Sequence, residues 1–87
     1  MIERTMVVTA AVGLHARPAA QFSEIAKSAG FTVEVGRDAS KLVNAASPLR
    51  LLTLKIKQGE SILVRCETTN QQVAEELLSH LEACISE

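Results

Sequence analysis

The sequence has few aromatic side chains and no excess of basic charge. Its 87 residues include two Phe, no Trp and no Tyr, and nine basic residues stand against ten acidic ones, for a formal net charge of −1. Proteins dedicated to nucleic acid normally carry a basic surface and aromatic platforms on which bases stack. We therefore expect no nucleic-acid partner.

Cysteines and long apolar runs are also scarce. Cys66 and Cys84 are too few for a disulfide framework. No stretch reaches the roughly 18 apolar residues of a membrane span, and the N-terminal segment lacks the basic and apolar regions of a signal peptide. These absences predict a cytoplasmic protein with free thiols and no membrane insertion.

The apolar pattern fits one small domain over residues 1–87, with a single modest core. Alternating residues predict strands and 3.6-residue spacing predicts helices. The predicted elements are a strand at 2–8, a helix ending at Gly30, strands at 31–35 and 41–44, a helix at 48–53, a strand at 62–67 and a final helix ending near residue 85. Short loops and a hairpin favour an α+β open-faced sandwich. Its four-stranded, largely antiparallel sheet would be covered on one face by three helices.

Several residues are expected to hold these elements in place. Met6 and Val8 should point inward, and Ser47 and Pro48 should start the second helix as cap and first residue. Thr69, with Gln72 three residues later, has capping-box spacing for the last helix. The apolar stripes are expected at Phe22, Ile25, Ala26 and Ala29 in the first helix and at Val73, Leu77, Leu81 and Cys84 in the last.

One segment differs from ordinary scaffold: it reads Gly13-Leu14-His15-Ala16-Arg17-Pro18-Ala19, where a loop becomes the first helix. Helix N-termini carry free N–H groups that favour anions, and Arg17 adds a guanidinium suited to phosphate oxygens. The positive helix end disfavours imidazolium, so His15 should be a neutral nucleophile. The segment predicts reversible phosphoryl carriage, with His15 as acceptor and Arg17 stabilising the group.

The sequence contains no Gly-rich nucleotide loop and no pair of carboxylates for magnesium, so another protein must supply the phosphoryl donor. We expect no cofactor. His80 and Cys84 lie four residues apart on one predicted helix. Two ligands do not make a structural zinc site, and we expect no metal.

The 13–19 segment resembles the active-site motif of the HPr family, the histidine-containing phosphocarriers of the sugar phosphotransferase system. The resemblance covers essentially the whole chain, including its length and element order. It implies that His15 accepts phosphate on Nδ1 from enzyme I and passes it to sugar-specific IIA components. Gly13, Ala16 and Pro18 would belong to the phosphate turn. The protein would be a monomeric carrier and a substrate of other enzymes, not a catalyst.

A second block, residues 43–47, resembles the family's regulatory serine region. The resemblance extends the expected partners to a serine kinase or a transcription regulator acting through Ser47. Against this, Ser47 before Pro48 is already a complete helix cap. Pro48 and Arg50 also depart from the family's usual aliphatic and glycine residues at these positions.

Leu49 and Leu52 are candidates for partner docking, because the resemblance implies an apolar patch near His15. The alternative is that one or both belong to the core of the domain. Arg17, Lys27 and Arg50 could form a basic rim that attracts acidic partners.

Three other functions remain open from the sequence. The first is a paralogous regulatory carrier of a nitrogen-type phosphorelay, which needs the same histidine. The second is a non-catalytic interaction domain in which His15 only caps a helix. The third is a small hydrolase, for which no second acid or base lies near His15 in the sequence.

Overall fold

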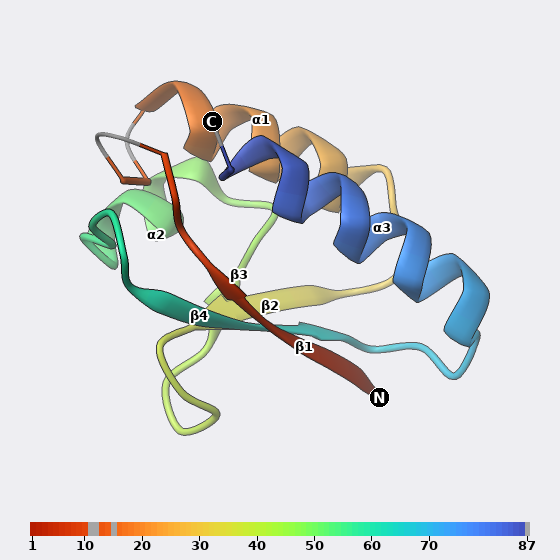
Figure 1. Ribbon diagram of the computed structural model, residues 1–87. Coiled ribbons are helices and arrows are strands. Elements are labelled where there is room, and N and C mark those ends of the chain that lie inside the picture. The colour runs from red at the N-terminus through yellow and green to blue at the C-terminus, as the bar shows by residue number, and fades with distance from the viewer. Residues whose placement is uncertain (11–12, 15, 87) are drawn as a thin grey trace.

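The elements follow one another in the order that the sequence predicts. A computed structural model describes residues 1–10, 13–14 and 16–86. Its elements are β1 (Ile2–Val7), α1 (Ala16–Lys27), β2 (Val33–Gly36), β3 (Val43–Asn44), α2 (Pro48–Thr53), β4 (Ser61–Cys66) and α3 (Gln71–Cys84). The strands form one sheet in the order β1-β4-β2-β3, with neighbours antiparallel. The helices lie on one side of it (Figure 1), which confirms the open-faced α+β sandwich.

Alternating side chains turn one face of each strand toward the helices. In β4, which pairs with both β1 and β2, Ile62, Val64 and Cys66 are fully buried while the residues between them are partly exposed. Met6 and Val8 are buried as predicted. Because successive side chains of a strand point to opposite faces, the intervening residues line the uncovered face of the sheet.

The uncovered face carries a row of charges across three strands. Arg65 of β4 lies opposite Glu3 of β1 on one side and Glu34 of β2 on the other. Its Nε donates a hydrogen bond to Oε2 of Glu3 at 2.6 Å. Opposite charges on paired strands stabilise the pairing of the strands modestly.

The helices bury the apolar stripes that the sequence indicates, with one exception. In α1, Phe22 and Ala26 are buried and Ile25 packs against the same core. The helix ends at Lys27, earlier than the predicted end at Gly30, so Ala29 packs against the core from the turn that follows α1. In α3, the buried stripe consists of Ala74, Leu77, Leu78 and Leu81. The prediction for Val73 is wrong, since 43% of this residue is exposed. Residue 73 lies at the margin of a stripe that is centred on the 74–77–78–81 positions.

The start of α3 also differs from the prediction. Asn70, not Thr69, is the N-cap, because its Oδ1 accepts a hydrogen bond from the backbone N–H of Val73 at 3.2 Å. Asn caps helices at least as well as Thr, so two adjacent candidates compete and local spacing alone cannot choose between them. The Asn70 N–H itself donates to Oγ1 of Thr68 at 3.1 Å.

All four strands have ends that differ from those predicted: β1 stops at Val7 and β4 runs from Ser61 to Cys66, each within one residue of its prediction, and the differences are larger in β2 and β3. β2 begins at Val33 rather than at Phe31, and β3 contains only Val43 and Asn44. The start of α2 is confirmed: Ser47 is its N-cap and Pro48 its first residue. Side-chain alternation thus locates a strand correctly, whereas its ends depend on which backbone groups find partners in the neighbouring strand.

Candidate functional site

The loop that leads into α1 is fastened to the segment before β4. The backbone N–H of Leu14 donates to the carbonyl of Ile56 at 3.0 Å, and the side chain of Leu14 is buried. The N–H of Gly13 donates to the carbonyl of Ala10 at 2.9 Å. The predicted phosphoryl acceptor, His15, lies outside the described residues, as do residues 11, 12 and 87. The chain just before it is therefore held by a long-range contact.

Position 13 requires a glycine for two reasons, its backbone conformation and the lack of room for a side chain. Its φ is +72°, in the left-handed region that other residues avoid. A Cβ atom at this position would lie 2.5 Å from the carbonyl oxygen of Ile56 and 2.8 Å from Cα of Lys57. Both neighbours are backbone atoms and cannot rotate away. This glycine lets the loop approach the 56–57 backbone closely enough for the Leu14 hydrogen bond.

The first turn of α1 presents positive groups to solvent. Ala16 and Arg17 are exposed, and the turn contains no acidic residue. Within the described part of the chain, Arg17 has no hydrogen-bond or ion-pair partner. Unpaired N–H groups at a helix start, beside a guanidinium, favour an anion.

The other side of this turn packs against the end of α3. Pro18 and Ala19 are buried, and Cys84 Sγ donates a weak hydrogen bond to the carbonyl of Pro18 at 3.7 Å. Ile85, the C-cap of α3, accepts the backbone N–H groups of Thr9 and Ala10, both at 3.0 Å. The last residues of α3 therefore support the loop and the helix start together.

α2 lies against α1 at the end of the molecule where α1 begins (Figure 1). The question that the sequence left open, whether Leu49 and Leu52 belong to the core, is now answered. Leu51 is the buried leucine, while Leu49 is 75% and Leu52 36% exposed. Arg50 is exposed beside them. α2 thus shows two apolar side chains and one cation near the start of α1.

Ser47 acts as a structural cap in this helix. Its backbone is extended, with φ −107° and ψ 109°, and its Oγ accepts a hydrogen bond from the N–H of Arg50 at 3.4 Å. The residue is partly buried. The cap accounts for the presence of a serine here, as the sequence alternative proposed.

Two residues that the sequence did not single out, Arg37 and Glu60, form an ion pair next to the 56–57 backbone that Gly13 approaches. The guanidinium of Arg37, in the turn after β2, donates from Nε and Nη2 to the two carboxylate oxygens of Glu60, at 3.0 and 3.1 Å. This bond raises the pKa of Arg37 and lowers the pKa of Glu60, with the Lys57 N–H as a second cause for Glu60. No sequence signal could have revealed the pair, because its members are 23 residues apart in a turn and a loop.

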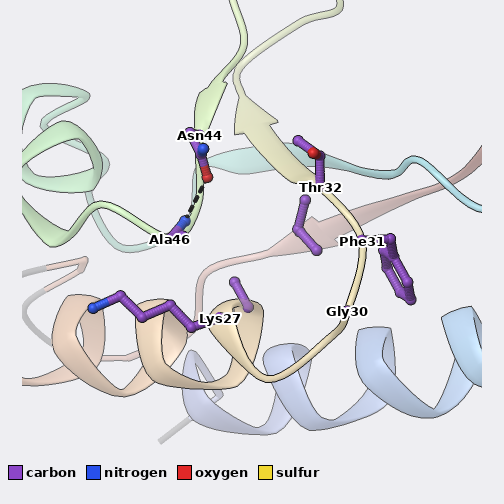
Figure 2. A pocket seen from close by; sticks show the side chains of 8 residues that line it. Lys27, Gly30, Phe31, Thr32, Asn44 and Ala46 are labelled. Carbon is purple, nitrogen blue, oxygen red and sulfur yellow. Dashed lines mark hydrogen bonds between the residues drawn. The ribbon is translucent and has the colours of Figure 1, made fainter.

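A solvent-open cavity of about 420 Å³ lies at the other end of α1, away from the 13–19 motif. Figure 2 shows it between the last turn of α1 and the ends of β2 and β3, with Lys27 and Asn44 at its walls. The Asn44 side chain is occupied locally, since its Oδ1 accepts from the N–H of Ala46 at 2.9 Å. The cavity and the motif are therefore separate features of the molecule.

The described residues contain no group of three or more His, Cys, Asp or Glu side chains that could hold a metal ion. His80 and Cys84 accordingly have no third ligand in that part of the chain. None of the helices within residues 1–10, 13–14 and 16–86 is long and apolar enough to cross a membrane.

Comparison with known proteins agrees with the fold and the motif. Residues 2–87 match the family model described as the PTS HPr component phosphorylation site. The phosphocarrier protein HPr of Streptomyces coelicolor is 39% identical over 83 residues, which cover 95% of this chain and 89% of that protein. The HPr of Haloferax volcanii is 39% identical over 87 residues, covering 94% of this chain and 98% of that protein.

A solved structure gives the same result. The crystal structure of HPr-C-His from Thermoanaerobacter tengcongensis superposes with a TM-score of 0.82 and 30% identity, covering 100% of this chain and 98% of that one. A four-stranded antiparallel sheet under three helices, with the histidine motif at the first helix, defines the class of small phosphocarrier domains. The chain belongs to the HPr family of the phosphotransferase system.

Proposed function

We propose that this protein carries a phosphoryl group on His15, accepting it from phospho-enzyme I and passing it to sugar-specific IIA components during sugar uptake. The observation that carries the proposal is the placement of the 13–19 motif at the start of α1, in a chain whose relatives are named phosphocarriers. The protein would work in the cytoplasm, as a monomeric single domain. It would be charged and discharged by other proteins rather than act as a catalyst.

The chemistry needs a nucleophile and a place for negative charge. A neutral imidazole nitrogen of His15 attacks phosphorus, and the bond between phosphorus and the donor breaks as the new P–N bond forms. The reverse exchange hands the group to the next acceptor. The helix N-terminus and the exposed Arg17 lie in the part of the chain where the transferred oxygens would need stabilisation.

Docking would use the surface of α2 beside the start of α1. Leu49 and Leu52 offer exposed apolar contacts, and Arg17 and Arg50 are exposed. Lys27 is also exposed, but it lies in the last turn of α1 at the wall of the cavity, so the predicted basic rim reduces to Arg17 and Arg50 at this surface. Basic groups around an apolar centre favour acidic partners and speed their encounter. Enzyme I and the IIA components would therefore share one surface.

Regulation through Ser47 has less support. The cap hydrogen bond explains this serine, and Pro48 and Arg50 differ from the residues that the family usually has there. We therefore keep the serine kinase and the transcription regulator outside the proposed function.

The test is phosphorylation by phosphoenolpyruvate and an enzyme I, followed by phosphorus NMR. We expect a phosphoimidazole signal in the unaltered protein and in His80→Gln, which removes the other histidine. His15→Gln should show none. Labelling of folded His15→Gln, or no signal with an enzyme I that charges its own carrier, would refute the proposal. The second result would favour the interaction domain.

The nitrogen-type alternative is separated by the next transfer. The charged protein is mixed with a sugar-specific IIA component and, separately, with a nitrogen-type IIA component. We expect the phosphoryl group to move faster to the sugar-specific protein. Preferential transfer to the nitrogen-type protein would support the regulatory carrier.

A further inference from the structure

Arg37 joins two parts of the chain that are distant in sequence, its own turn after β2 and the segment from Leu54 to Glu60. Besides its two bonds to Glu60, its guanidinium donates from Nη1 to the carbonyl of Leu54 at 2.7 Å and from Nη2 to the carbonyl of Lys55 at 3.1 Å. One side chain from the turn after β2 therefore contacts the end of α2 and the loop before β4. An isolated ion pair on a protein surface contributes little to stability. Four hydrogen bonds from one planar guanidinium, however, fix the relative positions of the groups that accept them.

Those carbonyls belong to the C-terminal end of α2. Leu54 is the C-cap, and Lys55 has a φ of +53°, in the left-handed region where helices commonly stop. Carbonyl groups at a helix end lack intrahelical partners and carry negative partial charge, so a cation there is favourable. Arg37 thus caps the helix that exposes Leu49 and Leu52.

The carboxylate of Glu60, which pairs with Arg37, binds the backbone of the same segment a few residues further on. Oε2 of Glu60 accepts the backbone N–H of Lys57 at 2.6 Å. Between the two anchored points lies Ile56, whose carbonyl accepts the N–H of Leu14. The close approach of Gly13 is also made to the 56–57 backbone. The segment from Leu54 to Glu60 therefore supports the residues that lead directly to His15.

We propose that Arg37 and Glu60 are positioning residues that hold the 13–14 turn and the exposed face of α2 in one fixed arrangement for phosphoryl transfer. The proposal rests on the proposed function but concerns residues outside the motif. A surface that is already ordered loses less entropy on binding. Loss of the pair should therefore weaken association with enzyme I more than it slows the transfer step.

The first test compares two arginines, each in an exposed ion pair. Arg37→Ala removes the ion pair with Glu60, and Arg65→Ala removes the ion pair with Glu3 on the uncovered face of the sheet. With phospho-enzyme I as the enzyme and the carrier as substrate, we expect Arg37→Ala to raise KM on the order of tenfold with kcat nearly unchanged. Arg65→Ala should leave KM as it is. Equal KM values for both variants and the unaltered protein would overturn the proposal.

The second test separates the network from a simple attraction of charges. In the double variant Arg37→Glu and Glu60→Arg, the two charges can still pair. However, a carboxylate would now face the carbonyls of Leu54 and Lys55. We expect KM to stay high, whereas Arg37→Lys should recover part of the loss. Full recovery in the double variant would mean that the pair acts only through its charge, against the proposed positioning role.

Amide hydrogen exchange tests the positioning without any partner protein. Arg37→Ala should speed exchange of the Leu14 N–H on the order of tenfold, while the N–H of Val64 in β4 keeps its protection. If the protein accepts no phosphoryl group but the Leu14 exchange changes as expected, the proposed function fails and the structural role stands. Unchanged Leu14 exchange would remove the positioning role even if phosphoryl carriage is observed.

Discussion

The two ends of α1 are built differently although both adjoin a glycine in the left-handed region. Gly13, before the helix, has φ +72°, and Gly30, after it, has φ +78°. A Cβ atom at Gly13 would lie 2.5 Å from the carbonyl oxygen of Ile56, whereas one at Gly30 would meet nothing within 4 Å. The same backbone conformation thus occurs once in a crowded place and once in open space.

The difference follows from what each end contacts. The start of α1 is held by the loop before β4 and by the end of α3, which are distant in the sequence. The other end closes with local bonds, such as the N–H of Ser28 to the carbonyl of Glu24 at 3.2 Å. It borders the open cavity of Figure 2. The loop before the histidine motif is therefore held by hydrogen bonds to segments distant in the sequence, whereas the last turn of α1 closes on itself.

The largest effect that tests this comparison is expected from Gly13→Ala. The left-handed backbone conformation and the clash with the Ile56 carbonyl each cost free energy. Together they should lower the free energy of unfolding by about 3 kcal/mol. Phosphorylation by enzyme I should fall with it, because the turn before His15 must move. Denaturant unfolding and the phosphorus NMR assay measure the two losses. A variant as stable as the unaltered protein would contradict the packing described at this turn.

Gly30→Ala should have a smaller effect. The new methyl group enters open space, so only the left-handed backbone conformation is penalised, at roughly 1 kcal/mol. Phosphoryl acceptance should be unchanged in the same assays. A loss as large as that of Gly13→Ala would show that the two ends of the helix are equivalent after all.

Between the two ends, Ser23→Ala should stabilise the protein slightly. Ser23 is 1% exposed, and its hydroxyl has no hydrogen-bond partner among the described residues. Removing a buried polar group without a partner, at a position where alanine favours the helix, should add about 0.5–1 kcal/mol. Ser28→Ala is the control, because that hydroxyl donates to the carbonyl of Ile25 at 2.7 Å. Thermal unfolding that ranks Ser28→Ala above Ser23→Ala would contradict this explanation.

The smallest effect concerns pH and the segment behind the motif. The hydrogen bond from Arg37, and next the Lys57 N–H, lower the pKa of Glu60 in the folded state. A carboxyl with a lowered folded pKa contributes stability above its unfolded pKa, and this contribution is lost as pH falls through the folded value. The stability difference between the unaltered protein and Glu60→Gln should therefore shrink as the pH falls below the ordinary glutamate pKa of 4.5. A difference that grows on acidification would reverse the assigned sign.

The sequence predicted best what depends on near neighbours in the chain. The alternation at Ile62, Val64 and Cys66, the stripe through Phe22 and Ala26, and the Ser47 cap are each confirmed. The errors at Thr69 and Val73 are errors of one position. They arose where two adjacent caps competed and where a residue lay at the margin of an apolar stripe.

The chemistry assigned to His15 and Arg17 stays a prediction, and the geometry of the candidate site was predicted only in part. The motif at the start of α1 and the candidate surface of α2 were both visible in the sequence. Which leucine of α2 is buried was not, because a six-residue helix has too few apolar positions to define a stripe. The contact of Arg37 with the end of α2 was also hidden, since it joins two turns through the fold.

The order of the elements, the apolar face of most of them and the chemical character of the 13–19 motif were determined by the sequence itself. Periodicity and capping act over a few residues, so they can be read along the chain. Only the tertiary structure decided that Leu51 is buried while Leu49 and Leu52 are exposed, and that Ile56 supports the turn before the histidine. These outcomes depend on segments that meet only after the sheet and the helices have packed together.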